Sequence, residues 1–184
     1  PLYVHLPKFY GDHLGVSLAA LGALLLVLRL ADALVDPLLG AWSDRARSRK
    51  GPIALAMPVL AVGLVALFMP PVHGEAALLA WLGASMALVY VAFSVATINH
   101  GAWGAELAAD PVERTRVTAV REGLALAGVV VASVAPALLG GADGEAAGMR
   151  RFALAFVVIC LGCAAVTLGL APSAPMPAAR GAPV

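Results

Sequence analysis

Three charged side chains lie within a single apolar run of this sequence. The stretch RLADALVD places Arg29, Asp32 and Asp36 at positions i, i+3 and i+7 of one predicted helix, so they project from one face. Each such charge costs about 2.5–3.5 kcal/mol at the centre of a membrane helix, so it usually faces an interior and has a function. A pair between Arg29 and Asp32 leaves Asp36 as a surplus carboxylate. Asp32 and Asp36 therefore predict a site for a monovalent cation, and sodium and a proton both satisfy the chemistry.

A second interpretation of these charges is purely structural. The Arg29–Asp32 pair would lock its helix to a neighbour, and Asp36 would be hydrated near the interface, since it lies roughly 9 Å along the axis from Trp42. Three charges on one face exceed what packing requires, and Pro37 frees a backbone carbonyl that can point into a cavity. We therefore expect a cation site.

Polar and aromatic side chains recur in a later apolar run. Two rows share the spacing i, i+4, i+7 and consist of Tyr90, Ser94, Thr97 and of Asn99, Trp103, Glu106. In lipid such faces turn toward protein or water, and aromatic rings suit stacking on a sugar. The predicted solute-facing residues are Tyr90, Thr97, Asn99, Trp103 and Arg121. The alternative is that Trp103 anchors its helix at the interface, that the other polar groups bond between helices, and that Arg121 belongs to a gate.

The turn after the charged run has a different character. Gly40 permits close helix contact, and Asp44, next to Arg45, can cap the N-terminus of a neighbouring helix. We expect these three residues to form a gating loop. Three basic residues follow, Arg47, Arg49 and Lys50, and they are expected to act as charge anchors without a gating role.

The elements that position these residues are predicted to be membrane helices. The chain is 61% hydrophobic and 12% charged, with a mean hydropathy of +0.92, whereas soluble domains are about 45–50% apolar and about 25% charged. A small fold in water exposes too much of its surface to hide so many apolar side chains. The net charge of +1 does not indicate a nucleic-acid partner. The predicted fold class is all-α, a polytopic membrane helix bundle.

Five stretches approach the roughly 20 apolar residues that a membrane-spanning helix requires. They run over about 16–42, 52–70, 76–107, 117–140 and 152–171 and make up the region 13–171. Residues 1–12 are predicted to be the end of a truncated first transmembrane helix. Residues 172–184, rich in proline and alanine, are predicted to form a cytoplasmic linker.

Basic residues indicate the orientation of the chain. They gather in the loops 43–51 and 108–116, which lie on one side of the predicted membrane, so these loops should face the cytoplasm. High usage of Ala, Gly, Val and Leu with little Lys suggests a GC-rich bacterial genome. The expected location is the bacterial inner (cytoplasmic) membrane, crossed several times.

Two segments resemble a known transporter family. RLADALVDPLLG, followed by SDR, resembles the second helix and following loop of the major facilitator superfamily, in its glycoside–pentoside–hexuronide:cation symporter (melibiose permease-like) branch. INHGAWGAELAADPVERTRVTAVREG is similar to the end of that family's fourth helix, the loop and the start of the fifth helix. The resemblance implies a twelve-helix transporter of which this chain is roughly the N-terminal half.

The resemblance also implies residue roles. Asp32 and Asp36 fall on the family's paired cation-site carboxylates, and Arg29 falls on their charged neighbour. Residues 40–45 match the loop that latches the cytoplasmic gate against the other half. Thr97 stands where melibiose-type members carry a sugar-binding aspartate.

The predicted function is secondary active transport, a cation-coupled symport of a sugar, glycoside or related small polar solute by alternating access. Two alternatives remain open: an amphiphilic solute such as a lysolipid, or a truncated, non-transporting membrane subunit. An enzyme is not expected, because the sequence has no nucleophile–base set and its four histidines lack metal-ligand spacing. The expected partners are the solute, the cation, the bilayer and the C-terminal half of the same transporter, with no nucleic acid and no cofactor besides the coupling cation.

Overall fold

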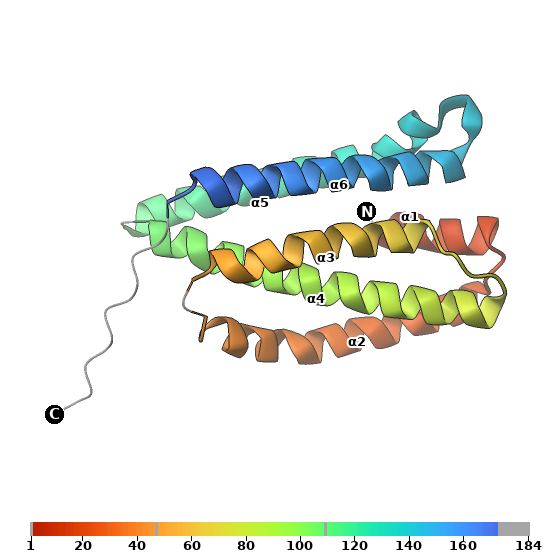
Figure 1. The fold of residues 1–184 in the computed structure, drawn as a ribbon, viewed down its shortest axis with the longest axis horizontal. Helices are drawn as coiled ribbons and strands as arrows, with labels where there is room; N and C mark the ends of the chain where they lie inside the picture. Colours follow the sequence, from red (N-terminus) through yellow and green to blue (C-terminus); the bar gives the residue numbers. More distant parts are fainter. Residues whose placement is uncertain (1, 47, 109, 173–184) are drawn as a thin grey trace.

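Helices make up nearly all of the described chain in the computed structural model (Figure 1). The structure describes residues 2–46, 48–108 and 110–172. In chain order its elements are α1 (Leu2–Lys8), the π-helical turn η1 (Phe9–His13), α2 (Leu18–Ser43), α3 (Lys50–Phe68), α4 (Glu75–Leu107), α5 (Pro111–Gly140), the 3-10 turn η2 (Gly141–Asp143) and α6 (Glu145–Leu170). The described residues form no strand, and the predicted all-α fold class is confirmed.

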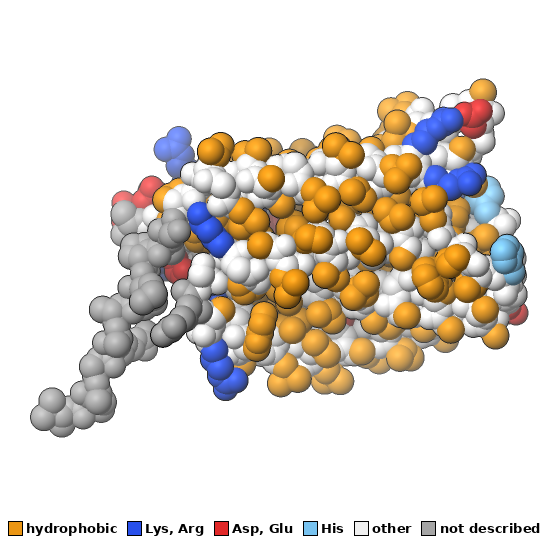
Figure 2. Space-filling view, viewed as in Figure 1, with side chains coloured by type: hydrophobic (Ala, Val, Ile, Leu, Met, Phe, Trp, Pro, Cys, Tyr) orange, Lys and Arg blue, Asp and Glu red, His pale blue; other side chains and the backbone are white. Residues whose placement is uncertain are grey.

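Five of the described helices, α2 to α6, are long and apolar enough to cross a membrane. The shortest of them, α3, has 19 residues and rises about 28 Å, which is close to the thickness of a bilayer's hydrocarbon core. Apolar side chains cover the flank of the bundle in Figure 2, and charged side chains gather toward its two ends. Such a surface is stable in lipid, so the chain is that of a multi-pass membrane protein.

The long helices pack in the order α2, α4, α3, α6, α5 (Figure 1). The central helices α3 and α4 carry most of the buried side chains, whereas α2, α5 and α6 expose most of theirs. Leu6, Phe9 and Tyr10 from α1 and η1 join the same buried cluster as side chains of α3 and α4. The short first element is therefore part of the core.

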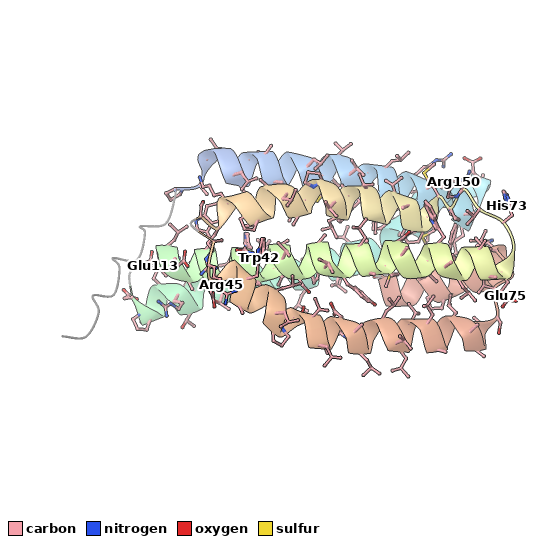
Figure 3. The ribbon with its side chains drawn as sticks, turned by 60° about the horizontal axis from the view of Figure 1, so that its bottom comes forward. Trp42, Arg45, His73, Glu75, Glu113 and Arg150 are labelled. Atoms are coloured by element: carbon pink, nitrogen blue, oxygen red, sulfur yellow. The ribbon has the colours of Figure 1, made fainter. Side chains whose placement is uncertain are left out.

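The two ends of the bundle differ in their charged residues. Figure 3 shows Arg45 and Glu113 at one end, and His73, Glu75 and Arg150 at the other. We call the first of these the basic end, which contains the α2–α3 turn, the α4–α5 turn and the end of α6. The other is called the opposite end.

The helices α5 and α6 begin well before the predicted spans, at residues 111 and 145 instead of 117 and 152. α5 begins at Pro111, because the Asp110 carboxylate accepts a hydrogen bond of 2.8 Å from the backbone N–H of Glu113 and caps the helix. α6 begins at Glu145, directly after the short turn that follows α5. Both helices therefore extend beyond their apolar stretches into polar sequence.

Parts of three predicted segments lie outside the described residues. The segment 172–184 is described only at Pro172, and the loops 43–51 and 108–116 are not described at Arg47 and Ala109. The linker and the sidedness of these loops stay predictions.

Side chains satisfy the backbone carbonyls at the end of α3. The last four carbonyls of a helix have no intrahelical donor, and lipid supplies no water to replace one. The Tyr10 hydroxyl donates to the Leu67 carbonyl at 2.9 Å, and the ring N–H of Trp81 donates to the Ala66 carbonyl at 2.8 Å. These bonds tie η1 and α4 to the end of α3.

Pro136 leaves one carbonyl of α5 without its usual donor. Because proline has no N–H, the Ala132 carbonyl cannot accept the regular helical bond from position 136. Nε2 of His5, a buried side chain of α1, lies 3.3 Å from this carbonyl oxygen. In the tautomer that carries the proton on Nε2, His5 donates to Ala132 and joins α1 to α5.

The helices α5 and α6 pass close to each other at Gly148. A Cβ added at this position would overlap the Pro136 carbonyl oxygen and lie 2.9 Å from the Gly140 backbone nitrogen. Since these are backbone atoms, a side chain at residue 148 has to push the two helices apart. Glycine is therefore required here by packing.

We expect Gly148→Ala to destabilise the α5–α6 pair by about 1–3 kcal/mol, the usual cost of overpacking a well-packed contact. The measurement is the thermal unfolding midpoint of the purified protein in detergent. Gly162→Ala is the matched control, because a Cβ at Gly162 on the same helix meets no atom within 4 Å. Equal midpoints for the two variants would show that the close approach is unimportant.

Candidate functional site

The charged residues of α2 form an ion pair beside the α2–α4 contact. Nη1 of Arg29 donates to Oδ2 of Asp32 at 3.1 Å. The Asp32 side chain is only 11% exposed, whereas that of Arg29 is 65% exposed. Leu21 and Ser43, which share the Asp32 side of α2 by helical periodicity, are buried. Asp32 therefore points into the bundle, and Arg29 lies at the edge of that face.

Asp36 carries a buried oxygen that lacks a donor. Its Oδ1 has essentially no accessible surface and no hydrogen-bond partner in the part of the chain that the structure describes. A buried acceptor without a donor costs free energy, and a buried carboxylate costs more. A proton or a bound cation would remove this cost. Within the described residues no group of three or more His, Cys, Asp or Glu side chains could hold a metal ion.

Two contacts set the register between α2 and α4. Near the opposite end, a Cβ on Gly83 would lie 3.5 Å from Leu24. Near the basic end, the Ser43 hydroxyl donates to Oδ1 of Asn99 at 2.6 Å, and both side chains are buried. The two helices therefore run in the same direction.

Counting along the helices between these contacts relates the carboxylates to α4. Asp32 lies at the depth of Tyr90, which is buried, and Asp36 lies at the depth of Phe93 and Ser94. The candidate cation site thus runs from the middle of α2 toward the basic end.

The predicted solute-facing residues of α4 lie in different environments. Tyr90 is buried and Thr97 is exposed, although both belong to one predicted row. The buried cluster that includes Leu6 and Tyr10 also includes Tyr90. Thr97 is exposed and therefore lies on a part of α4 that the described helices leave open.

Two residues of the second predicted row form hydrogen bonds within the chain. Asn99 bonds to Ser43, and its Nδ2 donates to the Val95 carbonyl at 2.8 Å. The ring N–H of Trp103 donates to the Pro172 carbonyl at 3.2 Å. Because nine residues turn a helix by about 180°, Asn99 projects opposite to Tyr90 and meets other helix ends. The solute contact of Asn99 and Trp103 stays a prediction.

Arg121 of α5 lies against the backbone of α4. Its Nε and Nη2 donate to one oxygen of Glu122, at 3.2 and 2.7 Å. A Cβ on Gly101 would lie 2.8 Å from Nη1 of Arg121. Since Gly101 is one helical turn from Thr97, the structure brings Arg121 and Thr97 to the same open face.

The predicted gating loop is largely exposed. The Asp44 side chain is 77% exposed and lies 3.5 Å from Nη2 of Arg49. Arg45 is exposed and forms no ion pair with the described residues. A Cβ on Gly40 would meet no atom within 4 Å. Asp44, Arg45 and Gly40 therefore remain accessible to other parts of the protein.

Arg49, expected to be a simple charge anchor, joins three elements. Its Nη1 donates to the Ser43 carbonyl at 2.9 Å and to the Ser43 hydroxyl at 3.1 Å, and its Nε donates to Glu106 at 3.0 Å. Sequence reasoning missed this role. The available signal was Glu106, because an acidic residue in the last turn of a helix opposes the helix dipole and needs a cationic partner.

We expect Arg49→Met to lower the free energy of unfolding by about 1.5–3 kcal/mol, the range for hydrogen bonds to a charged group. Thermal unfolding with Glu106→Gln and the double variant would separate the Arg49–Glu106 contribution. Arg45→Met is the control for loss of charge and should leave the midpoint unchanged. Additive effects of the Arg49 and Glu106 substitutions would contradict a direct interaction.

The sequence of this chain matches a protein-family model. A family model described as MFS/sugar transport protein matches residues 1–182. The chain belongs to this family. It is a family of transport proteins, which agrees with the prediction of a carrier rather than an enzyme.

Curated relatives of this MFS/sugar transport chain are named as symporters or transporters. The uncharacterized symporter YnaJ of Bacillus subtilis (strain 168) is 34% identical over 138 residues, covering 71% of the chain and 29% of YnaJ. The inner membrane symporter YicJ of Escherichia coli (strain K12) is 30% identical over 131 residues, covering 68% of the chain and 28% of YicJ. The isoprimeverose transporter of Lactiplantibacillus pentosus is 28% identical over 167 residues, covering 85% of the chain and 35% of that transporter.

The chain spans about a third of the length of these relatives. No solved structure matches it. The relatives and the family model confirm the resemblance to major facilitator superfamily symporters that the motifs of α2 and α4 indicated.

Proposed function

We propose that the protein containing this MFS/sugar transport chain is a secondary active transporter that couples symport of a sugar, glycoside or related small polar solute to a cation. The observation that carries the proposal is Oδ1 of Asp36, which is buried in the second half of α2 and has no donor among the described residues. A membrane protein that keeps such an oxygen needs a positive partner for it. A transported cation is that partner while it is bound, and the carboxylate loses the partner when the cation is released on the other side of the membrane.

The cation binds at Asp32 and Asp36 in this proposal. Arg29 offsets the charge of Asp32, so one negative charge remains on the pair. Sodium or a proton neutralises that charge, and the neutral site then permits the solute-loaded carrier to change its opening from one side to the other. The membrane potential contributes about 2.3 kcal/mol per transported charge at 100 mV.

The solute binds on the open face of α4 and α5. Thr97 offers a hydroxyl there, and Arg121 and Glu122 offer donors and acceptors side by side. This combination suits the hydroxyl groups of a sugar. Tyr90 shares the helical face of Thr97 and lies at the depth of Asp32. The names of the relatives, one of them an isoprimeverose transporter, support a sugar-like solute.

The proposed location is the bacterial inner membrane, with the basic end in the cytoplasm. The open faces of α2 and α5 pack against the remaining half of the transporter. Gly40, Asp44 and Arg45, which are accessible in this chain, form the loop that contacts that half when the cytoplasmic side closes.

The test uses the full-length protein in proteoliposomes with radiolabelled isoprimeverose, methyl β-D-glucoside and methyl β-D-glucuronide as probes. Each probe is offered with an inward sodium gradient, an inward proton gradient or no gradient. We expect at least one probe to accumulate under one cation gradient, and an ionophore for that cation to abolish the accumulation. Equal uptake of every probe with and without both gradients would contradict cation coupling.

A further inference from the structure

A lysine from the start of α3 holds the end of α6. Nζ of Lys50 donates to the Leu168 carbonyl at 3.1 Å and to the Ala171 carbonyl at 2.7 Å. Leu168 lies in the last turn of α6 and Ala171 directly follows it, where carbonyls lack intrahelical donors. The negative end of the helix dipole also favours a cation at this position. Lys50 therefore caps α6, and it lies 118 positions before Leu168 in the chain.

Trp103 of α4 completes this contact. Its ring N–H donates to the Pro172 carbonyl at 3.2 Å, and the Lys50 ammonium lies 5.4 Å from the centre of its ring. That distance is within the range of a cation–π interaction. The Trp103 side chain is 3% exposed. The ammonium group is thus held between carbonyl oxygens and an aromatic face.

We propose that Lys50 and Trp103 are positioning residues that form a clasp at the basic end. The clasp fixes the point where the chain leaves α6 to the start of α3 and the end of α4. A charge anchor would leave the amine free in water or among lipid headgroups, whereas all these contacts converge on the last turn of α6. This proposal goes beyond transport and does not depend on which solute or cation the protein carries.

The clasp has a mechanical consequence. α4 carries Thr97 and contacts Arg121 at Gly101, so it forms one side of the open face. The clasp therefore ties the end of α6, at Ala171 and Pro172, to the helix that forms this side of the open face.

The test is hydrogen–deuterium exchange of the full-length protein in nanodiscs, followed over the last turn of α6. The Ala171 amide, which donates to the Thr167 carbonyl at 3.0 Å, reports on this turn. We expect Lys50→Met to raise its exchange rate about tenfold, because the turn loses both carbonyl contacts and opens locally more often. Lys50→Arg keeps a donor and a charge and should restore protection. Trp103→Phe keeps an aromatic ring but has no N–H, and it should raise exchange about threefold.

Arg116→Met is the matched control, since Arg116 is an exposed cation near the same end and should not change the exchange of α6. Unchanged protection in Lys50→Met would overturn the clasp. Equally raised exchange at the centres of α3 and α4 would also overturn it, because that result would mean a general loss of stability. If Lys50→Met does not insert into membranes, Trp103→Phe decides alone, and unchanged protection in that variant overturns the proposal.

Discussion

Replacing Asp36 with Asn abolishes gradient-driven accumulation of solute while the protein still inserts into the membrane. Asn has nearly the same shape as Asp, but its neutral amide needs no cation, so the gradient is no longer coupled to solute movement. With one cation per uncharged solute, a potential of 100 mV supports an accumulation of about 50-fold. In Asp36→Asn proteoliposomes the accumulation ratio should fall to about one. Downhill exchange of the probe should persist.

Asp110→Asn is the matched control for this substitution. It removes one carboxylate from an exposed position, and Asn caps a helix about as well as Asp does. Its accumulation ratio should equal that of the unmodified protein. Undiminished accumulation in Asp36→Asn would exclude Asp36 from the cation site.

Replacing Asp32 with Asn while keeping Arg29 lowers both the yield of folded protein and its activity. The substitution removes the carboxylate that lies 3.1 Å from Arg29 and leaves a guanidinium unpaired within a membrane helix. Breaking an ion pair costs about 3–5 kcal/mol when both charges are buried. Because the Arg29 side chain is largely exposed, we expect the loss of folding free energy to be about 3 kcal/mol or less. The measurements are the amount of monodisperse protein after detergent extraction and its uptake of probe.

The double variant Arg29→Gln with Asp32→Asn separates the two causes. Removing both charges should restore the yield, because no unpaired charge remains, but it should not restore coupled uptake. Normal yield and normal uptake in the Asp32→Asn variant would mean that the pair is dispensable. Restored uptake in the double variant would move the cation site away from Asp32.

The single-variant results would also distinguish coupling from assembly. Asp36 has no partner charge in the described structure, so its replacement should affect coupling alone, whereas Asp32 supports Arg29 and should affect both. Similar losses of yield for the two substitutions would favour the structural interpretation, in which the charges of α2 serve only helix packing.

The membrane fold was predictable from the sequence because lipid imposes a simple rule. Every backbone polar group has to be satisfied within the segment, so an apolar stretch of about 20 residues forms a helix regardless of its neighbours. The same rule made Arg29, Asp32 and Asp36 stand out, since a charge in lipid is costly unless it has a function. Length, hydropathy and the position of rare charges are local properties, and they determined the helices and the candidate cation site.

Which face of α4 is buried and which is exposed was decided by the tertiary structure. Periodicity shows which residues share a face of the helix, but α4 is central and has neighbours on several sides. Only the packing decides that Tyr90 is covered, that Thr97 is open, and that Trp103 meets Lys50 and Pro172.

The roles of Arg49 and Lys50 were likewise decided by contacts between distant parts of the chain. As basic residues in a loop they indicate orientation and nothing more. In the folded chain they donate to Ser43, Glu106 and the end of α6, because helix ends at a membrane surface expose carbonyls that need donors. The sequence by itself determined which segments cross the membrane and which charges they carry. The tertiary structure decided which helix ends meet, since that depends on the packing of all the helices together.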